Sequence, residues 1–337
     1  MKSYHINLGG GLAGLTLKEQ DLPVPGPREV LIRVKASSLN YREIMILKGF
    51  YPLPVKPDVI PLCDGAGEIV AVGNGVTQMK VGDRVMAQVF PDWQDGPFSM
   101  EYAAQLGGSI DGMLAEYVVL PERAVLLIPP HLSYVEAATI PCAGLTAWNA
   151  LSGGRGLVAG ETVLTLGSGG VSLFALQLAK AAGARVIATT SSDEKAAKLK
   201  ALGADEVINY QSQPDWHLAV RDYTNGKGVD HVIEVGGGTT EQSIRSAAIN
   251  GEVALIGGVA DGATLVDINL VKYGLVNVVP VAIGSKAQFA AMNKVIAASK
   301  LQPVIDKVFA FREAPEAFSY SMQGKYFGKI VLDHSTF

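Results

Sequence analysis

Residues 162–192 read TVLTLGSGGVSLFALQLAKAAGARVIATTSS, and this stretch decides the fold. Its first five residues are apolar or β-branched, which is typical of a strand buried in a parallel sheet. A glycine turn follows at 167–170, and residues 171–182 are apolar on almost every side, which predicts a helix covered by protein. Gly183 can end that helix in the left-handed conformation, and residues 185–190 form a second apolar strand. The stretch therefore predicts a strand, a turn, a helix and a second strand.

The glycine turn predicts a phosphate-binding site. Glycine lets the backbone approach a pyrophosphate, and free N–H groups at a helix start point toward negative charge. Ser172 stands where the usual pattern has its third glycine, and its small side chain still permits close packing of helix on strand. An ordinary glycine turn without a nucleotide is the alternative, but the position between a strand and a helix favours a dinucleotide site. The turn residues expected to contact the cofactor are Gly167, Ser168, Gly169, Gly170 and Val171.

Composition narrows the class of protein. The chain has 337 residues, enough for two domains, and its net charge of −4 includes no basic run, so we expect no nucleic-acid partner. No apolar run reaches the roughly 20 residues that span a membrane, and no basic segment precedes an apolar core at the N-terminus. The two cysteines, Cys63 and Cys142, form no disulfide framework. We therefore expect a cytoplasmic protein that does not enter the membrane.

The pattern of elements changes along the chain. Residues 1–122 are β-rich and interrupted by glycine and proline, whereas strands alternate with helices over 123–299, which predicts a doubly wound parallel sheet. Its ligand should lie at the carboxyl ends of the strands, where Gly236 and Gly257 occur. A valine-rich segment at 276–283 contains a proline and predicts an edge strand, through which we expect the chain to form a homodimer.

In order and motifs, the chain resembles the medium-chain dehydrogenase/reductase superfamily over nearly its whole length. The resemblance implies an α/β protein with a GroES-like catalytic domain (1–122 and 300–337), a Rossmann NADP(H)-binding domain (123–299) and an active site in the cleft between them. It also implies that Thr146 contacts the cofactor, with Gly236 and Gly257. The motifs that carry the resemblance are residues 36–42 (ASSLNYR), 64–67 (DGAG), 81–85 (VGDRV), 112–117 (GMLAEY), 143–147 (AGLTA), the glycine turn and 328–331 (GKIV).

The resemblance bears on the metal. Zinc alcohol dehydrogenases have a cysteine, a histidine and a cysteine where this chain has Asn40, Cys63 and Cys142. A catalytic zinc needs three protein ligands, and an asparagine is a poor one. Residues 90–108, where a structural zinc lobe would lie, contain no cysteine. The chain is therefore similar to the zinc-independent quinone oxidoreductases, and we expect no metal.

A residual metal site is the alternative. The resemblance implies that Cys63 and Cys142 face the same cleft, with Asp64 and Glu43 close by. Two thiolates and a carboxylate could hold a soft metal. They could equally be small buried residues left from a zinc-binding ancestor.

The residues after the second strand bear on the choice of nicotinamide cofactor. An NAD enzyme usually has an acidic residue about 20 positions beyond the glycines, whereas residues 189–192 here read TTSS. Hydroxyl groups and a nearby ammonium can bind a 2′-phosphate. The alternative is that Ser191 caps the next helix and that Lys195 is a solvated surface charge. Similarity to NADPH reductases favours NADP(H), with Thr190, Ser191, Lys195 and Tyr210 as the contacts.

These patterns predict an NADPH-dependent enzyme that transfers hydride to a quinone, an enone or another carbonyl compound without a metal. By the resemblance, Tyr41 and Arg42 face the substrate, Tyr41 could donate a proton, and Asn40 could polarise the substrate oxygen. Alternatively, Tyr41 only packs beside the nicotinamide and Arg42 pairs with Glu43 or Asp64. Two other functions stay open: an alcohol dehydrogenase with a residual metal, and a non-catalytic NADPH-binding protein.

Overall fold

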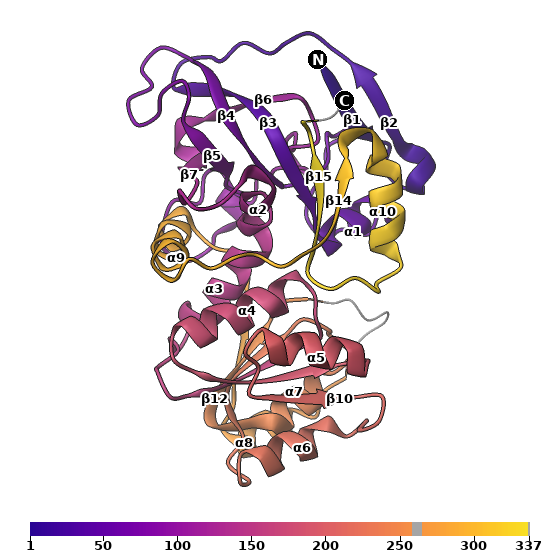
Figure 1. Ribbon diagram of the computed structural model, residues 1–337, viewed down its shortest axis with the longest axis vertical. Helices are drawn as coiled ribbons and strands as arrows, with labels where there is room; N and C mark the ends of the chain where they lie inside the picture. Colours follow the sequence, from indigo (N-terminus) through magenta and orange to yellow (C-terminus); the bar gives the residue numbers. More distant parts are fainter. Residues whose placement is uncertain (258–264, 336–337) are drawn as a thin grey trace. The chain divides into compact units, whose positions relative to one another are not determined.

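The computed structural model describes residues 1–257 and 265–335 and divides the chain into two compact units (Figure 1). Unit 1 contains Met1–Leu145 and Gly284–Phe337, and unit 2 contains Thr146–Ile283. Two segments that we expected in the Rossmann domain, 123–145 and 284–299, thus belong to unit 1. The physical reason is pairing: β7 (Val125–Leu127) extends the sheet of unit 1 through β5 (Arg84–Ala87), and the N–H of Lys286 at the start of α9 donates to the carbonyl oxygen of Trp93.

Unit 2 is a Rossmann fold. The six strands that the structure describes in this unit are all parallel and lie in the order β10-β9-β8-β11-β12-β13. Helices α4 and α5 cover one face of this sheet, and α6, α7 and α8 cover the other (Figure 1). The strands are β8 (Thr162–Leu166), β9 (Arg185–Thr190), β10 (Glu206–Asn209), β11 (Val229–Glu234), β12 (Ala247–Leu255) and β13 (Asn277–Pro280). The helices are α3 (Leu145–Ser152), α4 (Gly170–Ala181), α5 (Asp193–Ala201), α6 (Trp216–Tyr223), α7 (Thr240–Ser246) and α8 (Ile268–Gly274).

The sheet of unit 2 is buried on both faces. Leu164, Ile187, Val232 and Val253 lie on four neighbouring strands, are inaccessible to solvent and belong to one core with Trp216 of α6. Continuous apolar strands are what burial under helices on both sides requires. The doubly wound parallel sheet expected from the sequence is therefore confirmed, and the expected strand at 162–166 has the same bounds in the structure.

Unit 1 is β-rich, as expected for a GroES-like domain. Its main sheet runs β14-β15-β3-β4-β5-β7, with β6 paired to the first half of β3, and a separate hairpin joins β1 to β2. The strands are β1 (Lys2–Ile6), β2 (Leu15–Glu19), β3 (Glu29–Leu39), β4 (Asp64–Val72), β5 (Arg84–Ala87), β6 (Tyr117–Pro121), β7 (Val125–Leu127), β14 (Ile305–Ala310) and β15 (Lys329–Asp333). The helices are α1 (Tyr41–Lys48), α2 (Tyr134–Ala137), α9 (Lys286–Ser299) and α10 (Ala314–Met322).

The last strand of unit 1 brings distant parts of the chain together. β15 runs antiparallel to the second half of β3, so that Ile330 lies opposite Leu39. β4 flanks the other side of β3 and places Asp64 opposite Ser38. The start of β15, the end of β3 and the start of β4 therefore meet at one edge of the sheet. Among the described helices, none is long and apolar enough to cross a membrane.

Candidate active site

The glycine turn of unit 2 lies between β8 and α4. Gly169 is the N-cap residue of α4, and no side chain of the described residues caps the helix there. Gly167 has a φ of 73°, a left-handed conformation that favours glycine. The Ser172 hydroxyl donates to the carbonyl oxygen of Leu166 at 2.6 Å, so the serine at the third glycine position ties the helix to the strand. The turn thus presents backbone N–H groups of a helix start, which suits an anion.

A cavity of about 590 Å³ opens at the carboxyl ends of these strands. Trp216 and Pro214 form an apolar wall next to Tyr210, which is 37% exposed. Gly257 can only be glycine, because a β-carbon there would lie 2.3 Å from the carbonyl oxygen of Val235. An apolar wall beside a helix N-terminus is suited to a nucleotide. The predicted cofactor residues that line this cavity are Gly167, Ser168, Gly169, Gly170, Val171, Tyr210, Gly236 and Gly257.

The other predicted cofactor residues do not line the cavity. Thr146 is buried in α3, and Thr190 is buried at the end of β9, while Ser191 is exposed just beyond it. The alternative that Ser191 caps the next helix is wrong: Ser192 caps α5, and its hydroxyl accepts from the N–H of Lys195 at 3.3 Å. The hydroxyl of Ser191 is therefore not used to cap the helix. Among the described residues that line the cavity, none carries a carboxylate.

Glu234 belongs to this site, although our sequence analysis did not identify it. It is the last residue of β11 and is inaccessible to solvent. One carboxylate oxygen, Oε1, accepts from the N–H of Gly236 at 2.7 Å and of Gly237 at 3.0 Å. The other oxygen accepts from the hydroxyls of Thr239 and Ser243. Since Gly236 and Thr239 line the cavity, Glu234 shapes one of its walls. A carboxylate at the end of an apolar strand, two residues before three glycines, was the available signal.

Unit 1 contains a second candidate site, a buried group of residues that we call the Asp64 cluster. Its members are Asn40, Cys63, Asp64, Cys142 and Lys329. Asp64 is inaccessible to solvent, and its Oδ1 accepts from the N–H of Cys142 at 2.8 Å. Its Oδ2 accepts from the hydroxyl of Ser38 at 2.9 Å, from the amide of Asn40 at 2.8 Å and from the ammonium of Lys329 at 3.2 Å. The carboxylate therefore has donors on both oxygens.

Lys329 is the cation of this cluster. The residue is 3% exposed, and its ammonium also donates to the carbonyl oxygen of Leu39 at 2.7 Å and to the side-chain oxygen of Asn40. A buried ammonium is tolerated when acceptors surround it. Because an ammonium can only donate, Asn40 must turn its oxygen toward Lys329 and its NH₂ group toward Asp64 and the sulfur of Cys63, 3.7 Å away. The amide of Asn40 is thus held on both sides.

The predicted catalytic residues lie together in unit 1, at the start of α1. Asn40 is the N-cap residue, and Tyr41, the first helical residue, is half-buried. Arg42 is buried and donates to Glu43 at 2.8 Å, to Gln105 at 2.9 Å and to the carbonyl oxygen of Leu106 at 3.1 Å. The pairing of Arg42 with Glu43 that we considered is therefore confirmed.

Burial also changes two ionisable groups near α1. Desolvation raises the pKa of the Cys63 thiol well above its ordinary value, and a hydrogen bond with Cys142 and the charge of Glu43 act in the same direction. Desolvation likewise raises the pKa of Tyr51, whose hydroxyl donates to Gln105 at 2.9 Å. Cys63 is therefore a protonated thiol, and Tyr51 a neutral phenol, at neutral pH.

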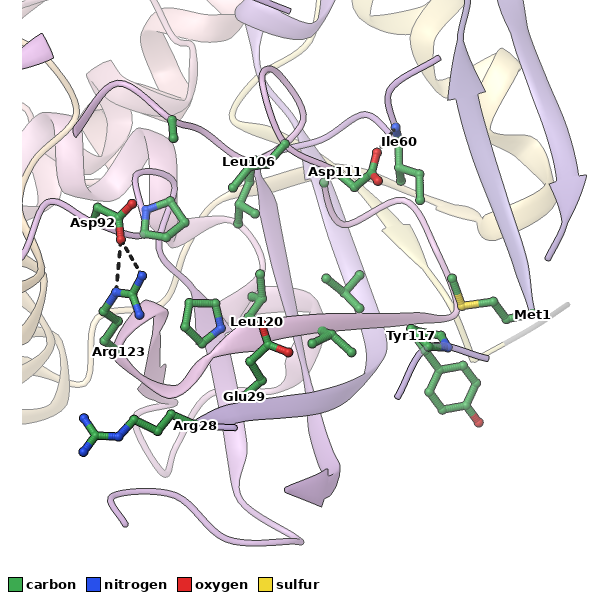
Figure 2. Close-up of a pocket in the computed structure, with 18 of the residues that line it drawn as sticks. Met1, Arg28, Glu29, Ile60, Asp92, Leu106, Asp111, Tyr117, Leu120 and Arg123 are labelled. Atoms are coloured by element: carbon green, nitrogen blue, oxygen red, sulfur yellow. Dashed lines mark hydrogen bonds and ion pairs between the residues drawn. The ribbon is translucent and has the colours of Figure 1, made fainter. Parts of the chain in front are cut away.

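A further cavity of unit 1, about 670 Å³ in volume, contains none of the predicted site residues (Figure 2). Figure 2 shows that Asp92 and Arg123 form a forked ion pair at one side of it, with N···O distances of 3.0 and 2.7 Å. Asp111, on another side, accepts from Lys56 at 2.6 Å and from the N–H of Ile60. These charges are already paired, and we assign no ligand to this cavity.

Comparison with known proteins identifies the family. Residues 26–130 match the alcohol dehydrogenase GroES-like domain, and residues 170–298 match the zinc-binding dehydrogenase domain. A zinc-type alcohol dehydrogenase-like protein of Schizosaccharomyces pombe is 43% identical over 94% of each chain. The chain belongs to the medium-chain dehydrogenase/reductase superfamily.

Other members of this superfamily are similar over the whole chain. A chloroplast envelope quinone oxidoreductase homolog of Arabidopsis thaliana is 32% identical over 96% of this chain and 95% of its own. The crystal structure of an NAD-dependent alcohol dehydrogenase is 34% identical, covers 99% of both chains and superposes with a TM-score of 0.89. This medium-chain dehydrogenase/reductase is accordingly an NAD(P)H-dependent oxidoreductase.

The match to the zinc-binding dehydrogenase domain raises the question of a zinc ion, and the Asp64 cluster is where the residues of this chain would have to hold it. Cys63, Asp64 and Cys142 place three ligand atoms within 4.8 Å of one another, which is a sufficient number of ligands. The carboxylate does not fit, however, because Lys329, Asn40 and Ser38 already donate to Oδ2 and the N–H of Cys142 donates to Oδ1. Asn40 points its N–H groups, rather than its oxygen, at Asp64 and Cys63. These residues therefore do not suit zinc.

Proposed function

We propose that this chain is a zinc-independent, NADPH-dependent reductase that transfers hydride to a quinone, an enone or another carbonyl compound. The observation that carries the proposal is the Asp64 cluster, in which donor groups occupy the carboxylate that a metal would need. A reductase of this kind needs no Lewis acid, since the cofactor supplies the hydride and the protein positions it.

The residues of unit 2 would bind the cofactor. The N–H groups of the glycine turn bind the pyrophosphate, and the wall formed by Tyr210, Pro214 and Trp216 packs against an aromatic base. Thr146 and Thr190 remain proposed contacts from the resemblance. Glu234 holds the N–H groups of Gly236 and Gly237 and so fixes the far wall.

NADP(H) is the proposed cofactor, although one relative is named as NAD-dependent. Support comes from the absence of a carboxylate among the described lining residues and from the exposed hydroxyl of Ser191 after β9. Lys195 lies in the first turn of α5 and adds a positive charge nearby. A 2′-phosphate prefers such surroundings to an acidic residue.

We propose different roles for the three residues at the start of α1. The hydroxyl of Tyr41 donates a hydrogen bond or a proton to the substrate oxygen that gains charge. Asn40 and Arg42 were expected to act on the substrate, but their polar groups are bonded within the protein. We therefore assign them as positioning residues that hold the Asp64 cluster and α1 in place.

The test follows NADPH absorbance with a panel of quinones, enones and aldehydes in the presence of a chelator, with NADH measured in parallel. Oxidation that survives the chelator and is faster with NADPH supports the proposal. Activity that depends on added zinc would instead support an alcohol dehydrogenase with a residual metal. Tight NADPH binding without turnover of any acceptor would support a non-catalytic binding protein.

We also propose a homodimer. β13 is an edge strand of the unit 2 sheet, and it is shorter than the predicted 276–283 segment. Tyr273 and Leu275 beside it are 75% and 58% exposed. An exposed apolar edge favours pairing with a second copy across a two-fold axis. Val279→Lys should shift the sedimentation coefficient from dimer to monomer; an unchanged coefficient would rule out this edge. Cys63 and Cys142 are thiols rather than a disulfide, which agrees with the expected cytoplasmic location.

A further inference from the structure

Lys329 has a role in the Asp64 cluster that the metal-free mechanism does not by itself require. Its ammonium is the one charge opposite Asp64 among the described residues of the cluster, and it reaches that carboxylate from a strand 265 positions further along the chain. The residue is 3% exposed, so water cannot replace these contacts. A buried lysine is expensive to desolvate and is kept only where specific acceptors receive it.

The contacts of Lys329 determine which atoms the cluster presents. Its ammonium bonds the oxygen of Asn40, which forces the NH₂ group of that amide toward Asp64 and the sulfur of Cys63. Its bond to Oδ2 of Asp64 joins those from Ser38 and Asn40, so that this oxygen has three donors. The interior of the cluster therefore presents hydrogen atoms where a cation needs lone pairs.

We propose that Lys329 keeps the Asp64 cluster closed to divalent metals and stands in for the metal as the cation of the site. Without the ammonium, Oδ2 of Asp64 loses one donor and the amide of Asn40 can rotate to present its oxygen. Cys63, Asp64 and Cys142 then offer two sulfurs and a carboxylate within 4.8 Å, a ligand set that suits a soft divalent metal. Lys329 is thus a positioning residue whose loss should create a metal site.

The experiment measures cobalt binding to the full chain without an affinity tag. Co²⁺ bound by thiolates absorbs in the near ultraviolet, which is a readout independent of enzyme activity. Lys329→Met removes the ammonium, and Lys329→Gln removes the charge while keeping a donor for Leu39, in case the methionine variant does not fold. Lys329→Arg keeps the charge and is the matched control. The double variant Lys329→Gln with Cys63→Ser tests whether the sulfur of Cys63 binds the cobalt.

Wild type and Lys329→Arg should show no thiolate–cobalt band, whereas the neutral variants should bind about one Co²⁺ per chain, at least about tenfold more tightly than wild type. The Cys63→Ser change should remove the band. Equal cobalt binding by wild type, or a folded neutral variant that binds none, would overturn the proposal.

This inference rests on the proposed metal-free function, and the two can fail separately. If wild type is active in chelator but the neutral variants bind no cobalt, only the role of Lys329 is wrong. If no acceptor is reduced and the neutral variants do bind cobalt, the reductase is wrong and the role of Lys329 stands.

Discussion

Glu234 offers a sharp test of how the cofactor cavity is held. Its buried carboxylate accepts two glycine N–H groups on one oxygen and two hydroxyls on the other. In Glu234→Gln, the amide oxygen still accepts the N–H groups of Gly236 and Gly237, while the NH₂ group faces hydroxyls that can rotate to accept. The loss is the charge assistance, about 1–2 kcal/mol.

Glu234→Leu has a similar volume and no acceptor at all. It leaves two partly buried N–H groups without this acceptor, at about 1–3 kcal/mol each, or about 2–6 kcal/mol together. Because 1.4 kcal/mol is tenfold in an equilibrium constant, the dissociation constant for NADPH should rise about fivefold to 30-fold in the glutamine variant and by more than about 30-fold in the leucine variant. The reason is that the cofactor must itself order the loosened wall.

Calorimetric titration with NADPH measures the binding, and scanning calorimetry measures the melting of unit 2, which should fall by roughly 4 °C for each kcal/mol. Glu241→Gln is the matched control, because Glu241 lies in α7 of the same unit and its ion pair among the described residues is with Arg245 at the surface. It should change stability by less than about 0.5 kcal/mol. A leucine variant with wild-type binding and melting, or a glutamine variant as damaged as the leucine one, would refute this account of Glu234.

Three further predictions concern the proposed site and the stability of unit 1. Tyr41→Phe should lower the turnover of enones and aldehydes by about 100-fold and spare quinones, whose protons can come from water; equal loss on both would argue against a proton donor. Lys195→Ala should raise the Michaelis constant for NADPH about tenfold and leave that for NADH unchanged, so parallel increases would favour NAD. Burial lowers the pKa of His334 from 6.5 to about 3, so the neutral form stabilises the fold above pH 6.5 and this stability is lost as the pH falls. The free energy of unfolding should therefore fall by about 1.4 kcal/mol per pH unit between pH 6.5 and 5, and His334→Gln should flatten this dependence in melting experiments. An unchanged pH dependence in the variant would contradict the prediction.

Local patterns predicted the elements well. The strand at 162–166 has the same bounds in the sequence prediction and in the structure, because the apolar pattern and the glycine turn that follows it act within a few residues. The capping residue of α5 was predicted one position too early, at Ser191 instead of Ser192. Two adjacent serines offer the same chemistry, and only the end of β9 at Thr190 decides between them.

The sequence by itself determined the parallel sheet of unit 2, the phosphate-binding turn and the family, since each depends on neighbouring residues or on the order of motifs. It also identified Asn40, Cys63 and Cys142 as the residues at the positions where zinc alcohol dehydrogenases have metal ligands. Only the tertiary structure decided what those residues face. The pairing of β15 with β3 places Lys329 next to Asp64, and Glu234 accepts a hydrogen bond from the N–H of Gly236 in the wall of the cofactor cavity. Such contacts join residues far apart in the chain or depend on where a side chain points inside the core, and no local pattern of residues records either.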